Sequence, residues 1–414
     1  MNTENEKHIV IVGAGFAGIR CALDLSKKRL KNTKITLIAN KPYFEYYPRL
    51  YRVVTGSSPI EACVRLDDIF KDKKVEIVVD EVANVDIKTQ SVAGKSGSVY
   101  HYTDLVLALG SETVYFGIDG VQERAFGFKS INEALTLKNH LHKMFDVYLS
   151  ENKEDIISKL SIVIVGGGPS GVELAGELTK YMKMLSVEHT LDNAFVTIDL
   201  VEAAPRLLPT LPEEVSVRVY NKLHSLGVNI FLNRTVVKED IDKITMKDMD
   251  LKTNTMIWTA GSRTNHFYST VVGLQIHKSG RVIVDEHMQA VDAPHVYIAG
   301  DAALTQYSGL AQTAIYDGAY IADTLYKISN NKKPRIYKPK KVSYAVPVSS
   351  KWAAVSVGPF KFYGYLPHIL RELIDLRFFF SILSIKQAFQ VFCSEYHRCE
   401  SCPTCMELLT PKAE

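Results

Sequence analysis

Two glycine-rich segments have the spacing with which proteins bind the pyrophosphate of a dinucleotide. The first, GAGFAG at Gly13–Gly18, follows the apolar run His8–Val12, and the second, GGGPSG at Gly166–Gly171, follows Leu160–Val165. In such a turn the first glycine permits a sharp reversal, the second lets a phosphate approach the backbone, and the third lets a helix pack on the strand. The N-terminus of that helix attracts the phosphate charge. One copy is weak evidence, but two copies, each followed by Ala and Leu at the same spacing, predict two dinucleotide-binding units.

The elements around these turns alternate between short apolar runs and longer helical patterns. Besides the strands before the glycine turns, we expect strands at Lys34–Ile38, Leu105–Leu109, Phe195–Val201, Met256–Thr259 and Val296–Ala299. Helices are expected between them, for example at Ile131–Leu149 and Glu213–Leu226. This alternation predicts an α/β fold with mainly parallel sheets. Because the last of these strands completes the first unit, we expect the second unit to be inserted in the first.

The composition is that of an ordinary globular protein. Of the 414 residues, 46% are hydrophobic and 23% are charged, and the net charge is only +3. These values exclude a disordered chain and give no indication of nucleic-acid binding. The longest stretch without a charged side chain, Ala302–Tyr316, is shorter than the roughly 20 apolar residues of a membrane-spanning helix. Since Met1–His8 lacks the apolar core of a signal peptide, we expect a cytoplasmic protein.

Taken together, the motifs resemble those of the type II, non-proton-pumping NADH dehydrogenases, also called NADH:quinone oxidoreductases. The resemblance covers residues 8–392. Besides the two glycine turns, it rests on Tyr43–Gly56, Asp104–Ser111, Gly166–Leu178, Trp258–Gly261, Tyr297–Asp301 and Leu310–Ala314. It implies two Rossmann-like domains, and transfer of a hydride from NADH to FAD and of two electrons onward to a quinone. The domains expected are an FAD domain at 1–115 and 262–330, an NADH domain at 116–261, and a C-terminal region at 331–414.

By this resemblance the first glycine turn binds FAD. The family usually has an acidic residue for the adenosine ribose at the end of the second strand, but here Ala39 is followed by Asn40, 22 residues after Gly18. The amide of Asn40 can bind the ribose hydroxyls, although without the charge. Gly300 and Asp301 close this unit, with the carboxylate placed to accept a hydrogen bond from the flavin ribityl chain. The alternative for Asp301 is a helix cap.

The second glycine turn is expected to bind the nicotinamide nucleotide. Its second strand ends at Glu202, 31 residues after Gly171, a long spacing that we attribute to a helix through Tyr181–Val187. A carboxylate there would bind the 2′-hydroxyl of NADH and repel the 2′-phosphate of NADPH. Arg206, four residues later, weakens that discrimination. We therefore expect NADH to be preferred.

Three side chains are the candidates for the chemistry with the quinone. The resemblance implies that Glu173 faces the flavin–nicotinamide junction and supplies a proton, which a carboxylate with a raised pKa does well. Its alternative role is structural, because an acid in the first turn suits the helix dipole. The family's quinone motif continues with two glutamines, whereas Gln312 is followed here by Tyr316 and Asp317. Tyr316 can stack on a quinone or pack on the protein body.

The complete set of residues expected to contact the two nucleotides follows from the resemblance. It comprises Gly13, Gly15, Ala17, Gly18, Asn40, Lys41, Pro48, Val82, Ala108, Gly110, Gly166, Gly168, Pro169, Ser170, Gly171, Glu202, Gly261, Gly300, Asp301, Ala311 and Gln312. The segment from Leu310 is expected to open a helix whose N-terminus points at the flavin and stabilises its reduced anion.

The C-terminal region has the pattern of a helix at a membrane surface. Apolar residues recur at helical spacing from Leu366 to Ile374 and again from Ile382 to Phe392, beside basic residues that include Arg371. We expect residues 364–393 to bind an anionic membrane, with Leu366, Ile369, Leu370, Leu373, Phe379 and Phe380 entering the interface. A cytoplasmic-face peripheral enzyme would result. The alternative is that these helices pack on the body or on a second subunit of a homodimer.

The cysteines leave further alternatives open. Sulfide:quinone oxidoreductases and disulfide reductases share this fold but need a redox-active cysteine pair, and no cysteine lies between Cys63 and Cys393. The tail contains Cys399, Cys402 and Cys405 at metal-ligand spacing, beside His397. A flexible reduced tail is the simplest interpretation, ahead of a metal site or redox-active thiols, and we assign no metal. A flavin-bound NADH sensor acting through this tail is the non-enzyme alternative.

Overall fold

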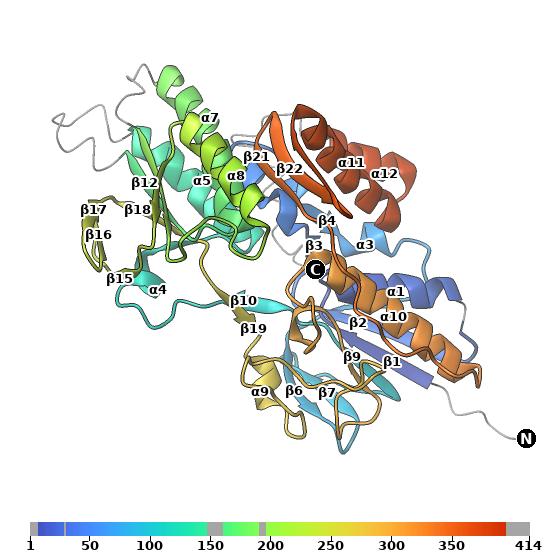
Figure 1. Ribbon diagram of the computed structural model, residues 1–414. Coiled ribbons are helices and arrows are strands. Elements are labelled where there is room, and N and C mark those ends of the chain that lie inside the picture. Colours follow the sequence, from blue (N-terminus) through green and yellow to red (C-terminus); the bar gives the residue numbers. More distant parts are fainter. Residues whose placement is uncertain (1–6, 29, 147–159, 190–195, 395–414) are drawn as a thin grey trace, which may run out of the picture. The chain divides into compact units, whose positions relative to one another are not determined.

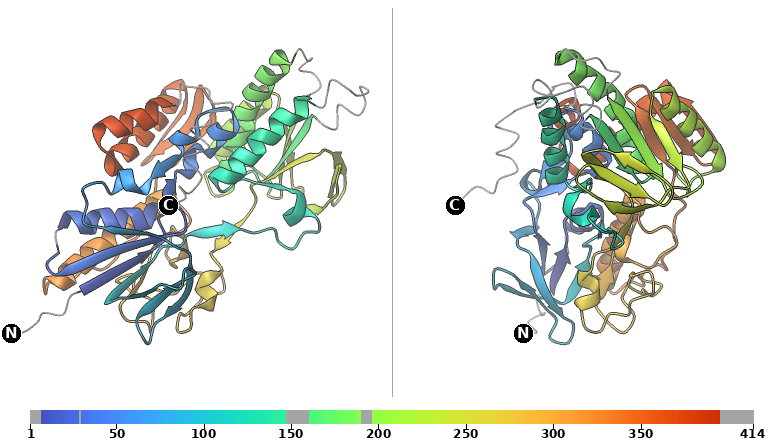
Figure 2. Two further views of the ribbon diagram at one scale, coloured as in Figure 1. Left: turned by 180° about the vertical axis from the view of Figure 1, so that it is seen from behind. Right: turned by 90° about the vertical axis from the view of Figure 1, so that its left-hand side faces the viewer.

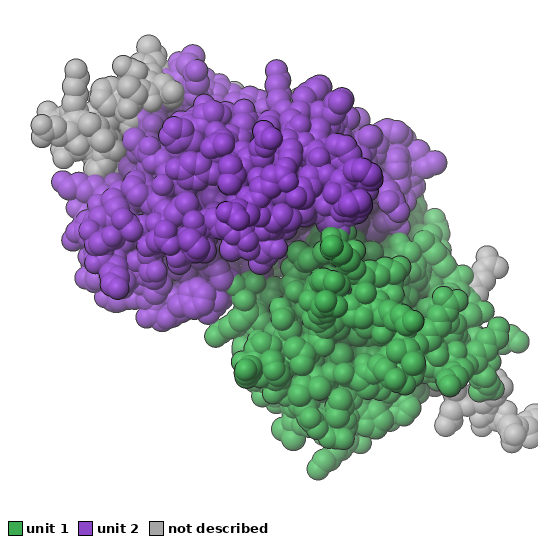
Figure 3. Space-filling view, in the orientation of Figure 1, with its two compact units in different colours: residues 1–44, 64–112, 262–342 green, residues 45–63, 113–261, 343–414 purple. Residues whose placement is uncertain are grey.

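The computed structural model describes residues 7–28, 30–146, 160–189 and 196–394. The chain divides into two compact units, coloured separately in Figure 3. Unit 1 contains residues 1–44, 64–112 and 262–342, and unit 2 contains residues 45–63, 113–261 and 343–414. The largest segment of unit 2 is thus inserted in the sequence between two segments of unit 1.

Unit 1 is built on a five-stranded parallel sheet with the order β20-β9-β1-β2-β5 (Figure 1). Its strands are β20 (Val296–Ile298), β9 (Asp104–Leu107), β1 (Lys7–Val12), β2 (Thr33–Ala39) and β5 (Glu76–Val79). The central strand β1 reads as an uninterrupted apolar run and is buried from Ile9 to Val12, as expected for a strand covered on both faces. A second, antiparallel sheet consists of β6 (Val82–Asp86), β7 (Ser91–Gly94) and β8 (Val99–His101).

Two helices pack side by side in unit 1, α1 (Phe16–Lys28) and α10 (Ala311–Ser329) (Figures 1 and 2). Their close approach depends on Gly318, because a Cβ built there would lie only 2.2 Å from the carbonyl oxygen of Ala17. Any larger residue at position 318 would force the helices apart. The N-terminus of α10 is thereby fixed relative to the glycine turn that precedes α1.

Unit 2 repeats the design with a parallel sheet of order β11-β18-β12-β13-β14. Its strands are β11 (Phe126–Gly127), β18 (Thr255–Trp258), β12 (Ser161–Val165), β13 (Thr197–Glu202) and β14 (Asn229–Leu232). The helices that accompany the sheet are α5 (Ile131–Asp146), α7 (Pro169–Glu188) and α8 (Glu213–Ser225). A small antiparallel sheet of β15 (Val236–Glu239), β16 (Lys243–Met246) and β17 (Asp250–Lys252) completes this part.

The C-terminal part of unit 2 is an antiparallel sheet followed by two helices. The strands are β21 (Ala345–Ser349), β22 (Trp352–Val357) and β23 (Phe360–Gly364), and the helices are α11 (Tyr365–Ile382) and α12 (Ile385–Cys393). The sheet approaches α7 at Gly176, where a Cβ would lie 1.5 Å from the oxygen of Val348. Short elements of the segment after residue 44 also belong to unit 2, namely η1 (Tyr47–Arg49), α2 (Leu50–Val54) and η2 (Pro59–Glu61).

The expected α/β fold with parallel sheets is confirmed, and the elements begin and end within two residues of the expected positions wherever both ends are described. The long helix that we expected between Gly171 and Glu202 is α7, which runs to Glu188. In the described ranges, no helix combines the length and apolar content needed to cross a bilayer. The expectations for His397 and the cysteines at 399–405 lie outside the described residues.

Candidate functional site

The glycine turn of unit 1 leaves an open space at the start of α1. Gly13 has φ +104 and its N–H donates to the carbonyl of Ile38 at 2.8 Å, which ties the turn to β2. A Cβ on Gly18 would lie 1.8 Å from the oxygen of Gly13, so the helix packs tightly on the turn. Gly15, by contrast, has nothing within 4 Å of a Cβ position. This geometry fits a pyrophosphate at Gly15, beside the positive end of α1.

The glycine turn of unit 2 has the same geometry. Gly166 has φ +116 and donates its N–H to the carbonyl of Val201 at 2.8 Å. A Cβ on Gly171 would lie 1.9 Å from the oxygen of Gly166, while Gly168 has nothing within 4 Å. The residues that follow, Pro169 and Ser170, are exposed in the first turn of α7. A second pyrophosphate therefore fits at Gly168.

The candidate ligand residues of each unit collect at the carboxyl edge of its parallel sheet, where α/β proteins bind nucleotides. In unit 1 the residues that follow the ends of β1, β2, β9 and β20 are Gly13, Asn40, Ala108, Gly110, Gly300 and Asp301. In unit 2 the residues that follow or end β12, β13 and β18 are Gly166, Gly168, Glu202 and Gly261. Ala17, Lys41, Val82, Ala311, Gln312 and Tyr316 also belong to unit 1, whereas Pro48 and Glu173 belong to unit 2.

Asp301 is held in a defined orientation at the end of β20. It lies in the 3-10 turn η5 (Gly300–Ala302), and Gly300 has φ +75, a conformation that favours glycine. The hydroxyl of Ser111 donates to Oδ2 of Asp301 at 2.5 Å. One carboxylate oxygen of Asp301 is therefore engaged within the protein.

Glu202 binds the glycine turn of its own unit. Its Oε2 accepts the N–H of Gly167 at 2.6 Å, and its Oε1 accepts the N–H of Ala204 at 2.7 Å. Each carboxylate oxygen has further lone pairs for the ribose of a nucleotide. The sequence predicted a contact between Glu202 and the ribose. It did not predict that this carboxylate also holds the glycine turn in place by accepting the amide of Gly167.

Arg206 is engaged within the loop that follows β13. Its Nη1 donates to the carbonyl of Leu211 at 2.8 Å and to the hydroxyl of Ser216 at 2.6 Å, and its Nη2 donates to the carbonyl of Pro209 at 2.6 Å. The guanidinium therefore holds the loop between β13 and α8 together. Because these donors are occupied within the loop, Arg206 gives little support to binding of a 2′-phosphate.

Glu173 lies just beyond the first turn of its helix and not within it, as the sequence had led us to expect. Because α7 begins at Pro169, Glu173 is the fifth helical residue, and the proposed interaction with the first-turn dipole is a wrong expectation. Burial raises the pKa of Glu173 to about 8, with Arg371 opposing the shift and Asp375 adding to it. A carboxyl group that is protonated at neutral pH is suited to donate a proton.

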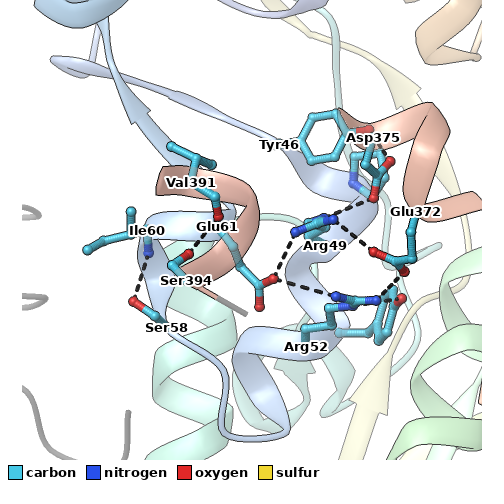
Figure 4. A network of polar contacts seen from close by, with 12 residues as sticks. Tyr46, Arg49, Arg52, Ser58, Ile60, Glu61, Glu372, Asp375, Val391 and Ser394 are labelled. Atoms are coloured by element: carbon cyan, nitrogen blue, oxygen red, sulfur yellow. Dashed lines mark hydrogen bonds and ion pairs between the residues drawn. The ribbon is translucent and has the colours of Figure 1, made fainter. Parts of the chain in front are cut away.

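A buried network of charges occupies unit 2 between the segment after residue 44 and helix α11 (Figure 4). Arg49, whose side chain is fully buried, donates to Glu61 at 3.1 Å, to Glu372 at 3.0 Å and to Asp375 at 2.9 Å. Arg52 also pairs with Glu372. This network was not predicted from the sequence, because Arg49 lies more than 300 residues from Glu372 and Asp375, although only 12 from Glu61.

Helix α11 buries an ion pair and exposes mainly apolar side chains. Its buried residues are Pro367, Arg371, Asp375, Phe379 and Ile382. Most of its large exposed side chains are apolar or aromatic, namely Tyr365, Leu366, Ile369, Leu370, Leu373, Ile374 and Phe380, beside the cation Arg377, and α12 adds Ile385 and Phe389. Such an apolar exposed side above buried charges is unusual for a helix on the surface of a soluble protein.

Two expectations for this helix are wrong. Phe379 is fully buried, with its ring 5.0 Å from that of Tyr46, so it belongs to the core rather than to an interface. Arg371 is 5% exposed and pairs with Asp375, so it cannot reach lipid headgroups. Both residues lie on the inward side of α11, which the spacing of the flanking leucines does not reveal.

The helix α10 carries the two quinone candidates of unit 1. It begins at Ala311, as expected, and places Gln312 and Tyr316 one turn apart on the same side. The ring of Tyr316 is half-buried, with the Nζ of Lys340 4.3 Å from its centre and the ring of Tyr337 at 5.6 Å. Its neighbour Asp317 is fully buried, a position that the sequence analysis noted only as a departure from the family motif.

The two parallel sheets, each ending in a glycine turn with space for a pyrophosphate, define a flavin- and pyridine nucleotide-dependent oxidoreductase. The model of the pyridine nucleotide-disulphide oxidoreductase family matches residues 7–318. A type II NADH:quinone oxidoreductase of Mycobacterium tuberculosis is 30% identical over 401 residues, which cover 89% of this chain and 84% of that protein. That of Staphylococcus aureus is 26% identical over 400 residues, covering 94% and 98%. The chain therefore belongs to the type II NADH:quinone oxidoreductases.

Solved structures agree with this fold. NDH2 from Plasmodium falciparum in complex with NADH superposes with a TM-score of 0.86 at 18% identity, over 96% of this chain and all of that one. The sulfide:quinone oxidoreductase of Aquifex aeolicus superposes with a TM-score of 0.77 at 17% identity, covering 92% of each chain. At these identities the likeness concerns the fold alone.

Proposed function

We propose that unit 1 binds FAD, that unit 2 binds NADH, and that the protein passes two electrons from NADH to a membrane quinone. When bound, NADH supplies the hydride and FAD accepts it and releases the electrons in turn. The observation that carries this proposal is the pair of matching glycine turns, each with open space at its second glycine position, Gly15 and Gly168. Two such turns offer space for two dinucleotides, and FAD and NADH are the two that the family to which the chain belongs uses.

The backbone and three side chains position the nucleotides in this proposal. The amides at the starts of α1 and α7 bind the two pyrophosphates. Asn40 and Glu202 bind the adenosine riboses of FAD and NADH, and Asp301 binds the ribityl chain of the flavin. The N-terminus of α10 at Ala311 stabilises negative charge on the reduced flavin ring.

Proton supply to the quinone is assigned to Glu173. Reduction of a quinone to a quinol consumes two protons, and a carboxyl group with a pKa of about 8 holds one at neutral pH. The charge of Arg371 lowers the pKa of Glu173, and the negative charge of Asp375, which pairs with Arg371, raises it. Gln312 and Tyr316 are the proposed contacts of the quinone on α10.

We also propose that residues 364–393 bind an anionic membrane, which would place the enzyme as a peripheral protein on the cytoplasmic face. The support is the outward apolar side of α11 and α12, together with the exposed cations Arg377 and Lys386. Each large apolar side chain that enters the interface contributes about 1.5–3 kcal/mol. A second copy of the chain is the alternative occupant of this surface, and sedimentation with and without liposomes distinguishes the two.

Within the described residues, Cys21, Cys63 and Cys393 form no disulfide, so nothing in that part of the chain favours the sulfide-oxidising or sensor alternative. Cys21 is fully buried, and burial raises the pKa of its thiol well above the usual range, which makes it unreactive. The cysteines at 399–405 lie outside the described residues. The chain's family membership therefore decides for NADH oxidation.

Anaerobic titration tests the proposal directly. The purified protein is expected to contain one FAD per chain, and one equivalent of NADH is expected to bleach the flavin absorption. Addition of a quinone should restore the absorption. A protein that lacks FAD, or whose FAD is not reduced by NADH, would contradict the proposal.

A further inference from the structure

Asp317 is a fully buried carboxylate beside the turn that we assign to the flavin. Its Oδ2 accepts the N–H of Gly300 at 3.1 Å, and its Oδ1 accepts the hydroxyl of Tyr337 at 2.6 Å. Burial raises the pKa of Asp317 to about 7, and the two hydrogen bonds oppose that shift. The acid thus links two groups that lie apart in the sequence, and the electron-transfer chemistry described above makes no use of it.

The first of these groups controls the position of Asp301. Gly300 precedes Asp301 in η5 and has a left-handed backbone conformation, so its amide direction determines where the next carboxylate lies. The hydroxyl of Ser111 orients Asp301 from the other side. Two hydrogen bonds therefore hold the turn, one from the Gly300 amide to Asp317 and one from the Ser111 hydroxyl to Asp301.

The second group belongs to a basic segment, defined as residues 331–341, which contains six Lys and Arg residues and no acid. The segment has no helix or strand, yet it is anchored to its surroundings. The N–H of Tyr337 donates to the carbonyl of Glu286 at 2.8 Å, and the hydroxyl of Tyr320 on α10 donates to the carbonyl of Arg335. The ring of Tyr337 contacts those of Tyr316 at 5.6 Å and Tyr320 at 5.0 Å.

We propose that Tyr337 and Asp317 are positioning residues for FAD, in which the Tyr337 hydroxyl orients the Asp317 carboxylate, and Asp317 fixes the Gly300 amide and hence Asp301. The basic segment then acts as a strap that helps to retain the flavin rather than as a passive connection to the C-terminal part. This inference rests on the proposed contact between Asp301 and the ribityl chain of FAD. It requires no contact between the strap and the nucleotide itself.

The test is the rate of FAD release from the full-length holoprotein, followed by the rise in flavin fluorescence after dilution. Tyr337→Phe removes one hydroxyl and keeps the ring contacts, and we expect it to release FAD about tenfold faster. It should also change the visible circular dichroism of the bound flavin, because the chromophore is held less firmly. Tyr320→Phe is the matched control, since it removes a strap hydrogen bond that does not involve Asp317, and it should leave both readouts at the wild-type values.

Asp317→Asn provides an independent check that does not depend on the tyrosine. Its amide oxygen can still accept the N–H of Gly300, but its amide nitrogen cannot accept the Tyr337 hydroxyl and can only donate to it, which replaces a bond to a carboxylate by a weaker neutral one. Release should therefore accelerate, by no more than in Tyr337→Phe, and the double variant should be no faster than Tyr337→Phe alone.

Two results would overturn the inference. One is a wild-type release rate in Tyr337→Phe, and the other is equal acceleration in Tyr320→Phe, which would indicate a general loosening of the strap. A wild-type protein that binds no FAD would refute the proposed function and this inference together, whereas FAD bound and released normally by Tyr337→Phe refutes this inference alone.

Discussion

Arg49 donates from Nε to Oδ2 of Asp375 at 2.9 Å, although 326 residues separate them in the sequence. Both side chains are buried, so the pair joins the segment after β3 (Tyr43–Glu45) to the middle of α11. A buried cation needs its counter-ions, because an isolated charge in the interior costs several kcal/mol. Ion pairs therefore hold the inward side of α11 against unit 2. The outward side takes no part in these ion pairs, so its residues can be apolar.

Replacement of Arg49 by Met should destabilise unit 2 by up to about 3–5 kcal/mol, because the buried Glu61 and Asp375 would lose the cation they share and keep only Arg52 and Arg371. Urea unfolding followed by tryptophan fluorescence reports on this unit, since Trp258 and Trp352 both belong to it. Lys243→Met is the control, because its pair with Asp250 also lies in unit 2 but is exposed, and is worth less than about 1 kcal/mol. Equal unfolding midpoints for the two variants would show that the network is not a stabilising element.

Reoxidation of the reduced enzyme by a quinone should slow as the pH rises through about 8. The reason is that Glu173, with its raised pKa, carries a proton below that pH and loses it above. In Glu173→Gln, reoxidation by the quinone should be slow at every pH and should show no fall near pH 8. Its flavin should still be reduced by NADH at the wild-type rate. Stopped-flow measurement of the two half-reactions separates these effects.

Glu177→Gln serves as the control for that prediction, because Glu177 lies one turn further along α7 and no role in the reaction is assigned to it. Glu177→Gln should keep the fall in the reoxidation rate near pH 8. If Glu173→Gln leaves both half-reactions unchanged, the proton comes from another group.

The preference for NADH over NADPH should depend on Glu202 and not on Arg206. Glu202→Ala removes a charged hydrogen bond worth about 1.5–3 kcal/mol, so the ratio of the two kcat/KM values should fall by about tenfold or more. Arg206→Gln should leave the ratio unchanged, because that guanidinium is engaged within its own loop. A ratio that rises in Arg206→Gln would mean that Arg206 does reach the phosphate in the wild type.

Binding to anionic liposomes should require the outward side of α11. Leu366→Glu with Leu373→Glu places two charges among exposed apolar side chains, 77% and 54% exposed, and should release the protein without loss of FAD. Val217→Glu on α8, 52% exposed, is the matched control and should still sediment with liposomes. Binding should persist at high salt, since the apolar contribution is not screened. Full binding by the double variant would place the membrane contact elsewhere.

Deletion of α11 is a poor substitute for this test. It would remove Glu372 and Asp375, which neutralise Arg49 inside unit 2. The truncated chain is therefore expected to unfold or aggregate whatever its role at a membrane. Point substitutions on the outward side avoid this difficulty because they leave the buried pairs in place.

The sequence predicted the parts of the molecule that depend on local pattern. Continuous apolar runs followed by glycine turns identified both parallel sheets and the positions of Gly15 and Gly168, because a turn that must admit a phosphate restricts the residue types within a few positions. The helical repeat of Leu366, Leu370 and Leu373 identified the outward side of α11 in the same way.

The sequence did not predict features that depend on distant partners. The spacing of Arg371 in the sequence is that of a surface cation. Its burial becomes apparent only from its ion pair with Asp375, which in turn pairs with the distant Arg49. Similarly, Asp317 was visible as a departure from the family motif, but its partner Tyr337 lies in a segment with no regular structure. The role of Glu202 in orienting its own glycine turn also depends on a contact across the sheet edge.

The most direct test of the account is steady-state oxidation of NADH by the purified holoprotein, with ubiquinone and menaquinone analogues as acceptors. We expect turnover within the usual enzyme range of about 1–1,000 per second with at least one quinone, and little oxidation of NADH when the quinone is omitted. Sulfide in place of NADH should support no quinone reduction. Tight binding of NADH with negligible turnover on every quinone, or quinone reduction by sulfide but not by NADH, would contradict the account.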